Sequence, residues 1–213
     1  MGIQRIIILG FGAVGMLLLM LLRRNKYPHI PLWKYPVISL VLTICGVAGA
    51  MLMHRIESGS FNGTSFFGAI LFVPVLMLPA LALRVSFDDL MDLSAPAECL
   101  MLMFMKLDCQ LNGCCYGKFL PALGFQFPSQ IVEIFVAFFL MLALLRQEKK
   151  SPVGGTLYGW YLILYGAVRF VLNWFRYGVA PFVWILPAGN FWSLVSIALG
   201  LVWLYLIRRK TSK

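Results

Sequence analysis

The chain has few charged residues and almost no histidine. Of its 213 residues, 12% are charged and 61% are hydrophobic, with only two histidines and eight acidic residues. A soluble domain carries about 25% charged and about 45–50% apolar residues. So few charges cannot cover a surface that faces water. The composition therefore excludes an ordinary soluble domain and predicts an integral membrane protein.

Two further absences narrow this class. The apolar run from Ile6 to Leu22 lacks a small-residue cleavage site, and Arg-Arg-Asn-Lys follows it, so a membrane anchor is expected rather than a removable signal peptide. Runs such as 137–145 lack the two-residue alternation that a transmembrane β-barrel requires. Because backbone polar groups in lipid need partners within their own segment, helices are the expected spans.

Seven apolar stretches are present, and several are long enough to cross about 30 Å of hydrocarbon as helices. They lie near residues 4–22, 35–53, 64–84, 93–107, 130–146, 155–174 and 188–207. The expected fold class is an all-α integral membrane protein with about seven transmembrane helices, and residues 1–213 form a single polytopic domain. The fourth stretch is short and ends at Lys106, which favours a tilted or partly re-entrant helix.

The basic residues predict an orientation. The net charge is +10, and twelve of the eighteen Lys and Arg residues fall in four groups. These groups are residues 23–34, Arg84, residues 146–150 and residues 208–213. Seven spans place all four groups on one side, which the positive-inside rule assigns to the cytoplasm. We therefore expect the N-terminus outside and the C-terminus in the cytoplasm. Topology and anionic lipids then explain the charge without nucleic acid.

The other six basic residues lie within the spans or at their outer ends. They are Arg5, Arg55, Lys106, Lys118, Arg169 and Arg176. Movement of the charged group to the interface explains Arg5, Arg55 and Arg176. Arg169 is different because it belongs to a polar stripe spaced four residues apart: Tyr161, Tyr165, Arg169 and Asn173. Such a stripe is predicted to face protein or water rather than lipid, and it indicates a functional site.

A polar segment, Lys-Leu-Asp-Cys-Gln-Leu-Asn-Gly-Cys-Cys-Tyr-Gly-Lys, interrupts the apolar chain at residues 106–118. Its cysteines allow three readings. The spacing of Cys109, Cys114 and Cys115 differs from that of paired zinc ligands, and both histidines lie elsewhere, so no metal site is expected. A disulfide from Cys109 to Cys114 or Cys115 remains open. Close packing beside the nearby glycines is favoured.

Six segments resemble, in order, those of the prolipoprotein diacylglyceryl transferases of the bacterial inner membrane. They are CGVAGAMLMHRIESG (45–59), TSFFGAILF (64–72), DLSAPAECLMLMFMKLDCQLNGCCYGK (92–118), FPSQIVE (127–133), YGAVRFVLNWFR (165–176) and GNFWSLVSIALG (189–200). The Gly-Cys-Cys-Tyr-Gly variant also resembles divergent members of the family. No single segment is specific, but their order and spacing together carry the resemblance.

The resemblance implies transfer of a diacylglyceryl group from phosphatidylglycerol to the lipobox cysteine of a prolipoprotein signal peptide. The reaction forms a thioether and releases sn-glycerol-1-phosphate. It implies no cofactor, and it places the chain in the bacterial cytoplasmic (inner) membrane as a multi-pass protein. Such an enzyme needs a cationic cradle for the phosphate and a base for the thiol, which attacks as the thiolate.

The resemblance also implies roles for particular residues. Arg169 matches the family's essential arginine, Tyr165 precedes it by one turn, and Lys106 stands at the signature arginine; these three are the expected catalytic residues. Arg169 and Lys106 are expected to bind the phosphate, and Tyr165 to orient it. The further residues expected at the lipid headgroup are Asn112, Gly113, Gly117, Gln130, Glu133 and Arg176.

Several positions depart from the family pattern. Phe67 stands where the family has a histidine, so no general base is obvious. Cys109 and Cys114 replace a signature asparagine and glutamate, and Lys106 keeps a charge but loses the bidentate fork of arginine. An alternative is therefore a non-catalytic or altered-substrate paralogue that binds anionic lipid or a lipidated partner. In the altered-substrate case, Cys114 or Cys115 acts as a nucleophile or redox thiol.

Overall fold

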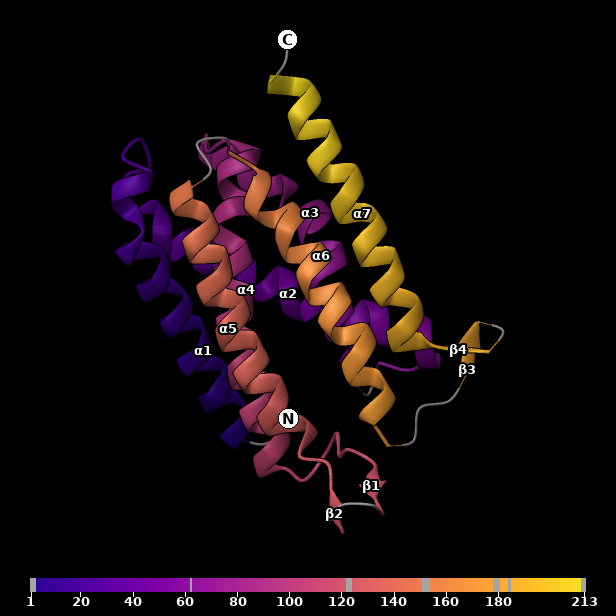
Figure 1. Ribbon diagram of the computed structural model, residues 1–213. Coiled ribbons are helices and arrows are strands. Elements are labelled where there is room, and N and C mark those ends of the chain that lie inside the picture. Colours follow the sequence, from indigo (N-terminus) through magenta and orange to yellow (C-terminus); the bar gives the residue numbers. More distant parts are fainter. Residues whose placement is uncertain are drawn as a thin grey trace.

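The computed structural model describes residues 3–61, 63–121, 124–150, 154–177, 181–183 and 185–211. Within these ranges the chain forms seven α-helices packed into one bundle (Figure 1). They are α1 (Ile3–Leu22), α2 (Lys34–Ser58), α3 (Phe66–Leu76), α4 (Phe87–Leu111), α5 (Ser129–Lys150), α6 (Thr156–Leu172) and α7 (Ala188–Thr211). The described strands form two short antiparallel hairpins, β1 (Phe119–Leu120) with β2 (Phe125–Gln126) and β3 (Pro181–Val183) with β4 (Leu186–Pro187). The predicted helical character is confirmed.

Four helices are long and apolar enough to cross a membrane. They are α1, α2, α5 and the part of α7 from Ala188 to Lys210. Each has at least 20 residues, which at 1.5 Å per residue matches a hydrocarbon core of about 30 Å. Among the others, α6 has 17 residues and α3 has 11. The described part of the chain therefore fits an all-α membrane protein.

Helix α4 lies at the centre of the bundle. Every residue from Leu90 to Cys99 is buried, and α4 packs against α1, α5 and α6. A helix buried on all sides belongs to the interior, where polar groups find protein partners instead of lipid. Asp92 shows this, because its carboxylate accepts the backbone N–H groups of Gly155 at 2.7 Å and Leu157 at 2.9 Å. These bonds tie the start of α6 to α4.

The fourth helix is longer than its apolar stretch. It begins after Ser86, whose hydroxyl oxygen accepts the backbone N–H of Asp89 at 3.1 Å and caps the helix. A search for apolar runs does not include the polar residues in the first and last turns of α4, so it underestimates the length of this helix. With 25 residues, α4 spans about 37 Å. The fourth helix therefore extends beyond the apolar stretch 93–107 at both ends, and its tilt in a membrane stays a prediction.

The third apolar stretch does not form one continuous helix. It divides into α3 and a 3-10 helix, η2 (Leu78–Leu83). Pro79 is the second residue of this second piece, and Pro74 lies inside α3. Each proline removes a backbone donor and crowds the preceding turn, so prolines at this spacing break up a long helix.

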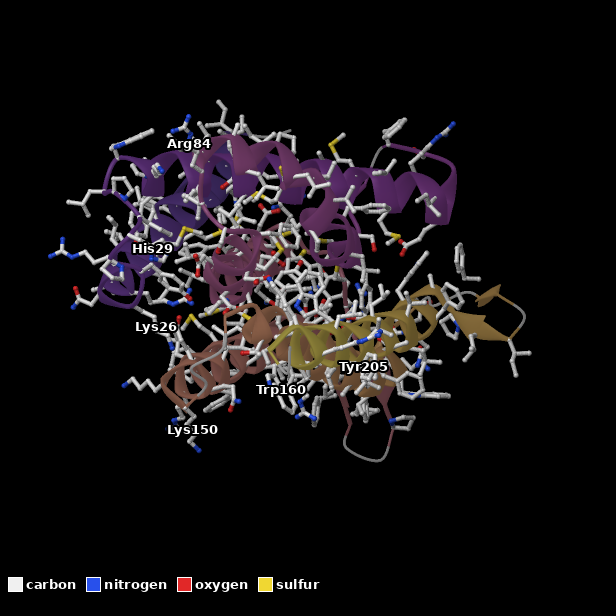
Figure 2. All side chains as sticks on the ribbon, turned by 90° about the horizontal axis from the view of Figure 1, so that it is seen from above. Lys26, His29, Arg84, Lys150, Trp160 and Tyr205 are labelled. Atoms are coloured by element: carbon white, nitrogen blue, oxygen red, sulfur yellow. The ribbon has the colours of Figure 1, made fainter. Side chains whose placement is uncertain are left out.

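The basic groups gather at one end of the bundle. Figure 1 shows the last turns of α1, α5 and α7 at the same end, and the last turns of α5 and α7 carry basic residues. Figure 2, which looks down on the bundle, shows Lys26, Arg84 and Lys150 on one side of it. Lys210 joins the group through its ion pair with Asp88, at 2.6 Å between Nζ and Oδ2. This arrangement agrees with the predicted grouping of the basic residues.

The polar segment 106–118 lies at the opposite end, beside the start of α1 (Figure 1). Arg5 Nε lies 2.9 Å from Asp108 Oδ2, and this ion pair joins the first turn of α1 to the last turn of α4. Movement toward the lipid interface was the expected explanation of Arg5. The structure instead gives Arg5 a carboxylate partner within the protein.

Candidate functional site

Three charged side chains from three helices meet inside the protein. Lys106 Nζ lies 2.8 Å from one carboxylate oxygen of Glu133, and Arg169 NH1 lies 2.7 Å from the other. All three residues are at most 7% exposed. Burial of a charge is costly unless it is paired, so this arrangement depends on the surrounding fold. We call Lys106, Glu133 and Arg169 the charged trio.

The trio depends on the packing of α4, α5 and α6, which all contact one another. Lys106 comes from the last two turns of α4, Glu133 from the first two turns of α5 and Arg169 from the last turn of α6. The Ser129 hydroxyl donates to Glu133 Oε1 at 3.3 Å and helps to hold the carboxylate. The structure thus brings together Lys106, Glu133 and Arg169, three of the residues that the sequence singled out.

The polar stripe of α6 faces the protein interior, as its spacing predicts. Tyr161, Tyr165, Arg169 and Asn173 are all buried. Asn173 lies just beyond α6 in the 3-10 helix η3 (Asn173–Phe175), and its side-chain amide donates to the amide oxygen of Asn190 in α7. The stripe therefore leads from the aromatic core to the charged trio.

Phe67 lies against the catalytic candidate Tyr165. The two ring centroids are 5.5 Å apart in an edge-to-face arrangement, and Phe66 contacts the same ring at 5.4 Å. Phe67 is 4% exposed. The position at which the family carries a histidine is thus occupied here by an apolar ring, next to a residue one turn from Arg169. This ring packs Tyr165 in place and cannot accept a proton.

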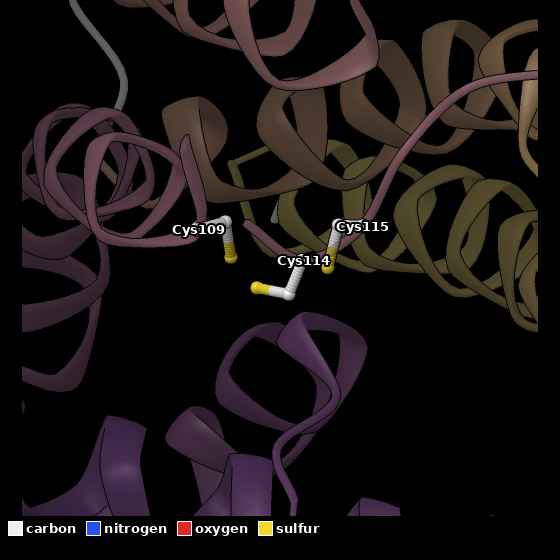
Figure 3. A group of neighbouring side chains, drawn as sticks. All are labelled: Cys109, Cys114 and Cys115. Carbon is white, nitrogen blue, oxygen red and sulfur yellow. The ribbon is translucent and has the colours of Figure 1, made fainter. Parts of the chain in front are cut away.

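The chain from Cys109 to Lys118, which we call the cysteine loop, brings its three cysteines together at the end of α4. Asn112 caps the helix, Gly113 adopts a left-handed conformation with φ +62°, and the backbone N–H of Cys114 donates to the Cys109 carbonyl at 3.0 Å. This is the Schellman arrangement, in which a residue beyond the helix bonds back to its last turn. Cys115 is also left-handed, with φ +63°. The sulfur atoms of all three cysteines lie within 4.8 Å of one another (Figure 3).

Hydrogen bonds fix the cysteine loop to both neighbouring segments. The Gln130 side-chain amide of α5 donates to the Cys114 carbonyl at 2.6 Å. Gly117 forms a β-bridge with Arg176, and the backbone N–H of Lys118 donates to the Phe175 carbonyl at 2.7 Å. Gly117, Gln130 and Arg176 thus join the loop to α5 and to the segment after α6.

The loop environment favours the thiolate of Cys115. A hydrogen bond from the Cys109 thiol lowers the pKa of Cys115 to about 5, against the opposing effect of burial. The positive charges of Lys106 and Arg176 act in the same direction. Cys115 also interacts electrostatically with Arg169. The cysteine loop and the charged trio therefore form one electrostatic unit.

Asn112 and Gly113, which the sequence predicts at the lipid headgroup, do not lie in the buried charged trio. Asn112 and Gly113 are exposed at the end of α4. The Asn112 side-chain amide donates to Asp108, at 2.8 Å to the carbonyl and 2.7 Å to the carboxylate. The structure thus places Asn112 in the helix cap and in the Arg5–Asp108 pair. Its role at a lipid headgroup stays a prediction.

Glu57 was missed by reasoning from the sequence. It is half-buried near the end of α2, accepts a hydrogen bond from the Ser65 hydroxyl at 3.0 Å, and interacts electrostatically with Arg169 and Arg176. A single glutamate at a helix end is ordinarily a solvated charge. Its electrostatic interaction with Arg169 depends on where the bundle places the end of α2 relative to α6, which no local sequence pattern reports.

Four helices are long and apolar enough to span a membrane, and the bundle buries a cationic site near one end. These features define a helical membrane protein with an internal polar site. The family of prolipoprotein diacylglyceryl transferases matches residues 5–206. The chain therefore belongs to this family, as its six segments predict.

Several relatives carry the name phosphatidylglycerol–prolipoprotein diacylglyceryl transferase. The chain is 34% identical to the one from Chlorobaculum tepidum, over 60% of this chain and 50% of the relative. It is 29% identical to the one from Clostridium tetani, over 53% and 51%. It is 26% identical to transferase 2 of Clostridium perfringens, over 94% and 89%. The chain spans about half the length of the first two relatives.

Proposed function

We propose that the chain moves a diacylglyceryl group from an anionic phospholipid, phosphatidylglycerol in the first place, to the cysteine thiol of a prolipoprotein signal peptide. The charged trio is the observation that carries this proposal. Membership of the family and the names of its relatives support it. Arg169, Lys106 and Tyr165 are the catalytic residues of the proposal, with Gln130, Glu133 and Arg176 in supporting roles.

The charge of the trio suits a phosphodiester. Two cations share one carboxylate, which leaves one positive charge in excess among three buried groups. An uncompensated buried charge is costly, and a phosphodiester monoanion would balance it. The guanidinium of Arg169 offers paired donors of the geometry that phosphate oxygens accept. Arg176 adds a second guanidinium that acts on Glu133.

The proposed reaction breaks a carbon–oxygen bond and forms a carbon–sulfur bond. The acceptor thiolate attacks the glyceryl carbon that bears the phosphate. The electron pair of the C–O bond passes to the phosphate oxygen, and glycerol phosphate leaves with one more negative charge than the phosphodiester had. The thiol proton is released. Arg169 and Lys106 stabilise the charge that develops on the leaving phosphate, where low local polarity strengthens their effect.

The membrane arrangement belongs to the same proposal. Residues 1–213 form one polytopic domain in the bacterial inner membrane, crossing it with seven helices. The end that carries the basic last turns of α5 and α7 faces the cytoplasm in this proposal, in accordance with the positive-inside rule. The charged trio and the cysteine loop then lie toward the outer leaflet, where exported prolipoproteins present their lipobox cysteine.

The apolar side chain of Phe67 favours a second candidate function. An apolar ring against Tyr165 supplies no base, so the chain would be a silent paralogue that binds anionic lipid or a lipidated partner. The two functions differ in one product. A silent paralogue binds phosphatidylglycerol through Arg169 but never forms a thioether.

Complementation separates these functions. The chain is expressed in cells depleted of their own diacylglyceryl transferase, and lipoproteins are analysed by mass spectrometry. We expect the mass of a diacylglyceryl group on the lipobox cysteine, and its loss in Arg169→Ala. An unmodified cysteine, with the protein verified in the membrane, would reject the transferase and leave the lipid-binding paralogue.

A further inference from the structure

The three thiols of the cysteine loop converge as metal ligands do. Their sulfur atoms all lie within 4.8 Å of one another. Sulfur ligands at about 2.3 Å from a tetrahedral zinc ion lie about 3.8 Å apart. Small side-chain rotations therefore suffice to bring Cys109, Cys114 and Cys115 onto one ion. Figure 3 shows the three side chains turned toward the space between them.

The other two cysteines show how this chain uses a thiol for packing. Cys99 is fully buried in α4. Cys45 is buried in α2, and its thiol donates to the Leu76 carbonyl at 3.2 Å. The three loop cysteines are instead only partly buried, and all five cysteines are free thiols in the structure. Close packing explains Cys45 and Cys99 but not three partly exposed thiols gathered in a polar loop.

The loop is preorganised for this geometry. Cys115 holds a left-handed backbone, with φ +63°, which is unfavourable for a residue with a side chain and persists only where its surroundings impose it. Those surroundings are the bond from the Cys114 N–H to Cys109, the bond from Gln130 to Cys114, and the β-bridge at Gly117. A rigid loop brings the sulfur atoms together before any ion binds.

The charges around the loop suit a thiolate–metal unit. Three thiolates and one Zn²⁺ carry a net charge of −1. Lys106 and Arg176 act on Cys115, and Arg5 acts on Cys114. These cations offset the negative unit without supplying a ligand. Among the described residues, no histidine or carboxylate joins the three sulfur atoms as a fourth close ligand.

We propose that Cys109, Cys114 and Cys115 bind a zinc ion whose fourth position receives the acceptor cysteine thiol. Catalytic zinc sites have three protein ligands and one position for substrate, and a thiol that coordinates zinc is deprotonated outright. This step rests on the proposed transferase function, because that function supplies the thiol acceptor. The metal then takes over the task for which Phe67 provides no base.

The chemistry balances without an oxidant. The acceptor thiol loses its proton to water on binding zinc. Its lone pair then forms the C–S bond to the glyceryl carbon while the C–O electrons leave with the phosphate. Cys115 interacts electrostatically with both Lys106 and Arg169, so the zinc-bound thiolate and the phosphate would lie in neighbouring parts of one site. The thioether, a weaker ligand than the thiolate, then leaves the zinc.

Metal content is the first test. The full chain is purified in detergent with a reductant and without chelator. Its zinc content per chain is measured by elemental mass spectrometry, and its zinc affinity by titration with Zn²⁺. We expect about one tightly bound Zn²⁺ per chain, and an affinity at least about 100-fold weaker in Cys109→Ser, Cys114→Ser and Cys115→Ser. Cys45→Ser is the matched control, because it removes a thiol outside the loop, and it should bind zinc as the wild type does.

Two readouts in the wild type keep the test independent of whether the variants fold. Bound zinc should protect the three loop cysteines from alkylation, as counted by peptide mass spectrometry. Co²⁺ in place of Zn²⁺ should give a thiolate charge-transfer band that changes when a lipobox peptide is added. The same peptide with serine for cysteine should leave the band unchanged. An unprotected loop, a Cys109–Cys115 disulfide in its place, or a band insensitive to the peptide thiol would overturn the inference.

A transfer assay on the same preparations separates this inference from the function it rests on. Transfer at the wild-type rate by zinc-free protein, or by all three serine variants, overturns the zinc site and leaves the transferase in place. Zinc and peptide-thiol binding with no transfer in any preparation rejects the transferase and supports the zinc site alone.

Discussion

Arg169 and Glu133 form an ion pair inside the helical bundle. Arg169 NH1 lies 2.7 Å from Glu133 Oε1, and the side chains are 8% and 4% exposed. The pair joins α6 to α5, and Lys106 occupies the second oxygen of the same carboxylate. A phosphate that enters this site meets two cations already held in position, so little reorganisation is needed during the reaction.

Replacement of Arg169 by alanine should abolish transfer while the protein still folds. Loss of one preorganised charge donor costs about 100- to 1,000-fold in rate. Lys106 remains, but its ammonium is a point charge and cannot replace the paired donors of a guanidinium. Glu133 keeps Lys106 as its partner, so the fold should persist. The measurement is diacylglyceryl transfer to a lipobox peptide, followed by mass spectrometry.

The matched control for Arg169→Ala is Arg55→Ala. Arg55 is an exposed arginine near the end of α2 whose guanidinium lies 5.3 Å from the ring centroid of Phe61. Its replacement removes the same charge without touching the charged trio, and transfer should stay near the wild-type rate. Equal activity in both variants would remove Arg169 from the chemistry.

Lys106 should tolerate arginine but not alanine. The ammonium of Lys106 is a point charge, whereas arginine presents a planar fork to phosphate oxygens. Lys106→Arg should therefore keep or raise kcat/KM for phosphatidylglycerol, and Lys106→Ala should lower it by about 100-fold. Lys118→Ala, which removes an exposed lysine at the far end of the same polar segment, is the control. Unchanged turnover in Lys106→Ala would contradict a phosphate role for this lysine.

The sequence predicts this site unevenly. Tyr165 and Arg169 lie on one helix face at a spacing of four, so their shared burial follows from helical periodicity. The pairing of Lys106 with Glu133 does not follow from helical periodicity, because it depends on how α4 packs against α5. Hydropathy alone also misses the true length of α4, since its capping Ser86 and the following aspartates are polar.

The cysteines show a different limit. Their spacing resembles no paired zinc motif, so the sequence favours close packing. What gathers them is a helix cap: Gly113 turns left-handed, and the chain returns over Cys109. The Asn-Gly pair at 112–113 signals a turn, but it does not report that Cys115 also turns left-handed. The convergence therefore becomes visible only in three dimensions.

Gly117→Ala should disrupt the cysteine loop. A β-carbon at Gly117 would collide with the backbone of Phe127, which cannot move as a flexible side chain can. The collision should break the β-bridge to Arg176 and lower both zinc content and transfer by at least about tenfold. Gly10→Ala is the control, because the same methyl group there has open space within α1. Equal zinc content in the two variants would show that the bridge does not hold the loop.

Glu148 provides the opposite case, a buried ion pair that should serve stability and not chemistry. Arg23 donates to both of its carboxylate oxygens, from NH2 at 2.6 Å and from Nε at 3.0 Å, and the Tyr27 hydroxyl donates at 2.8 Å. Glu148 lies 15 residues after Glu133 on α5, about 22 Å along the helix. It therefore belongs to the basic end, away from the charged trio.

Glu148→Gln should destabilise the protein by about 3–5 kcal/mol, because the buried Arg23 loses its counter-charge. The measurement is the unfolding transition in detergent, followed by a label-free fluorescence method. Transfer per folded molecule should remain near the wild-type value, since no group at this end touches substrate in the proposed reaction. Arg146→Gln, also on the last turns of α5, is the control for loss of one charge there and should leave stability nearly unchanged. A normal unfolding midpoint with impaired transfer in Glu148→Gln would instead connect the basic end to the chemistry.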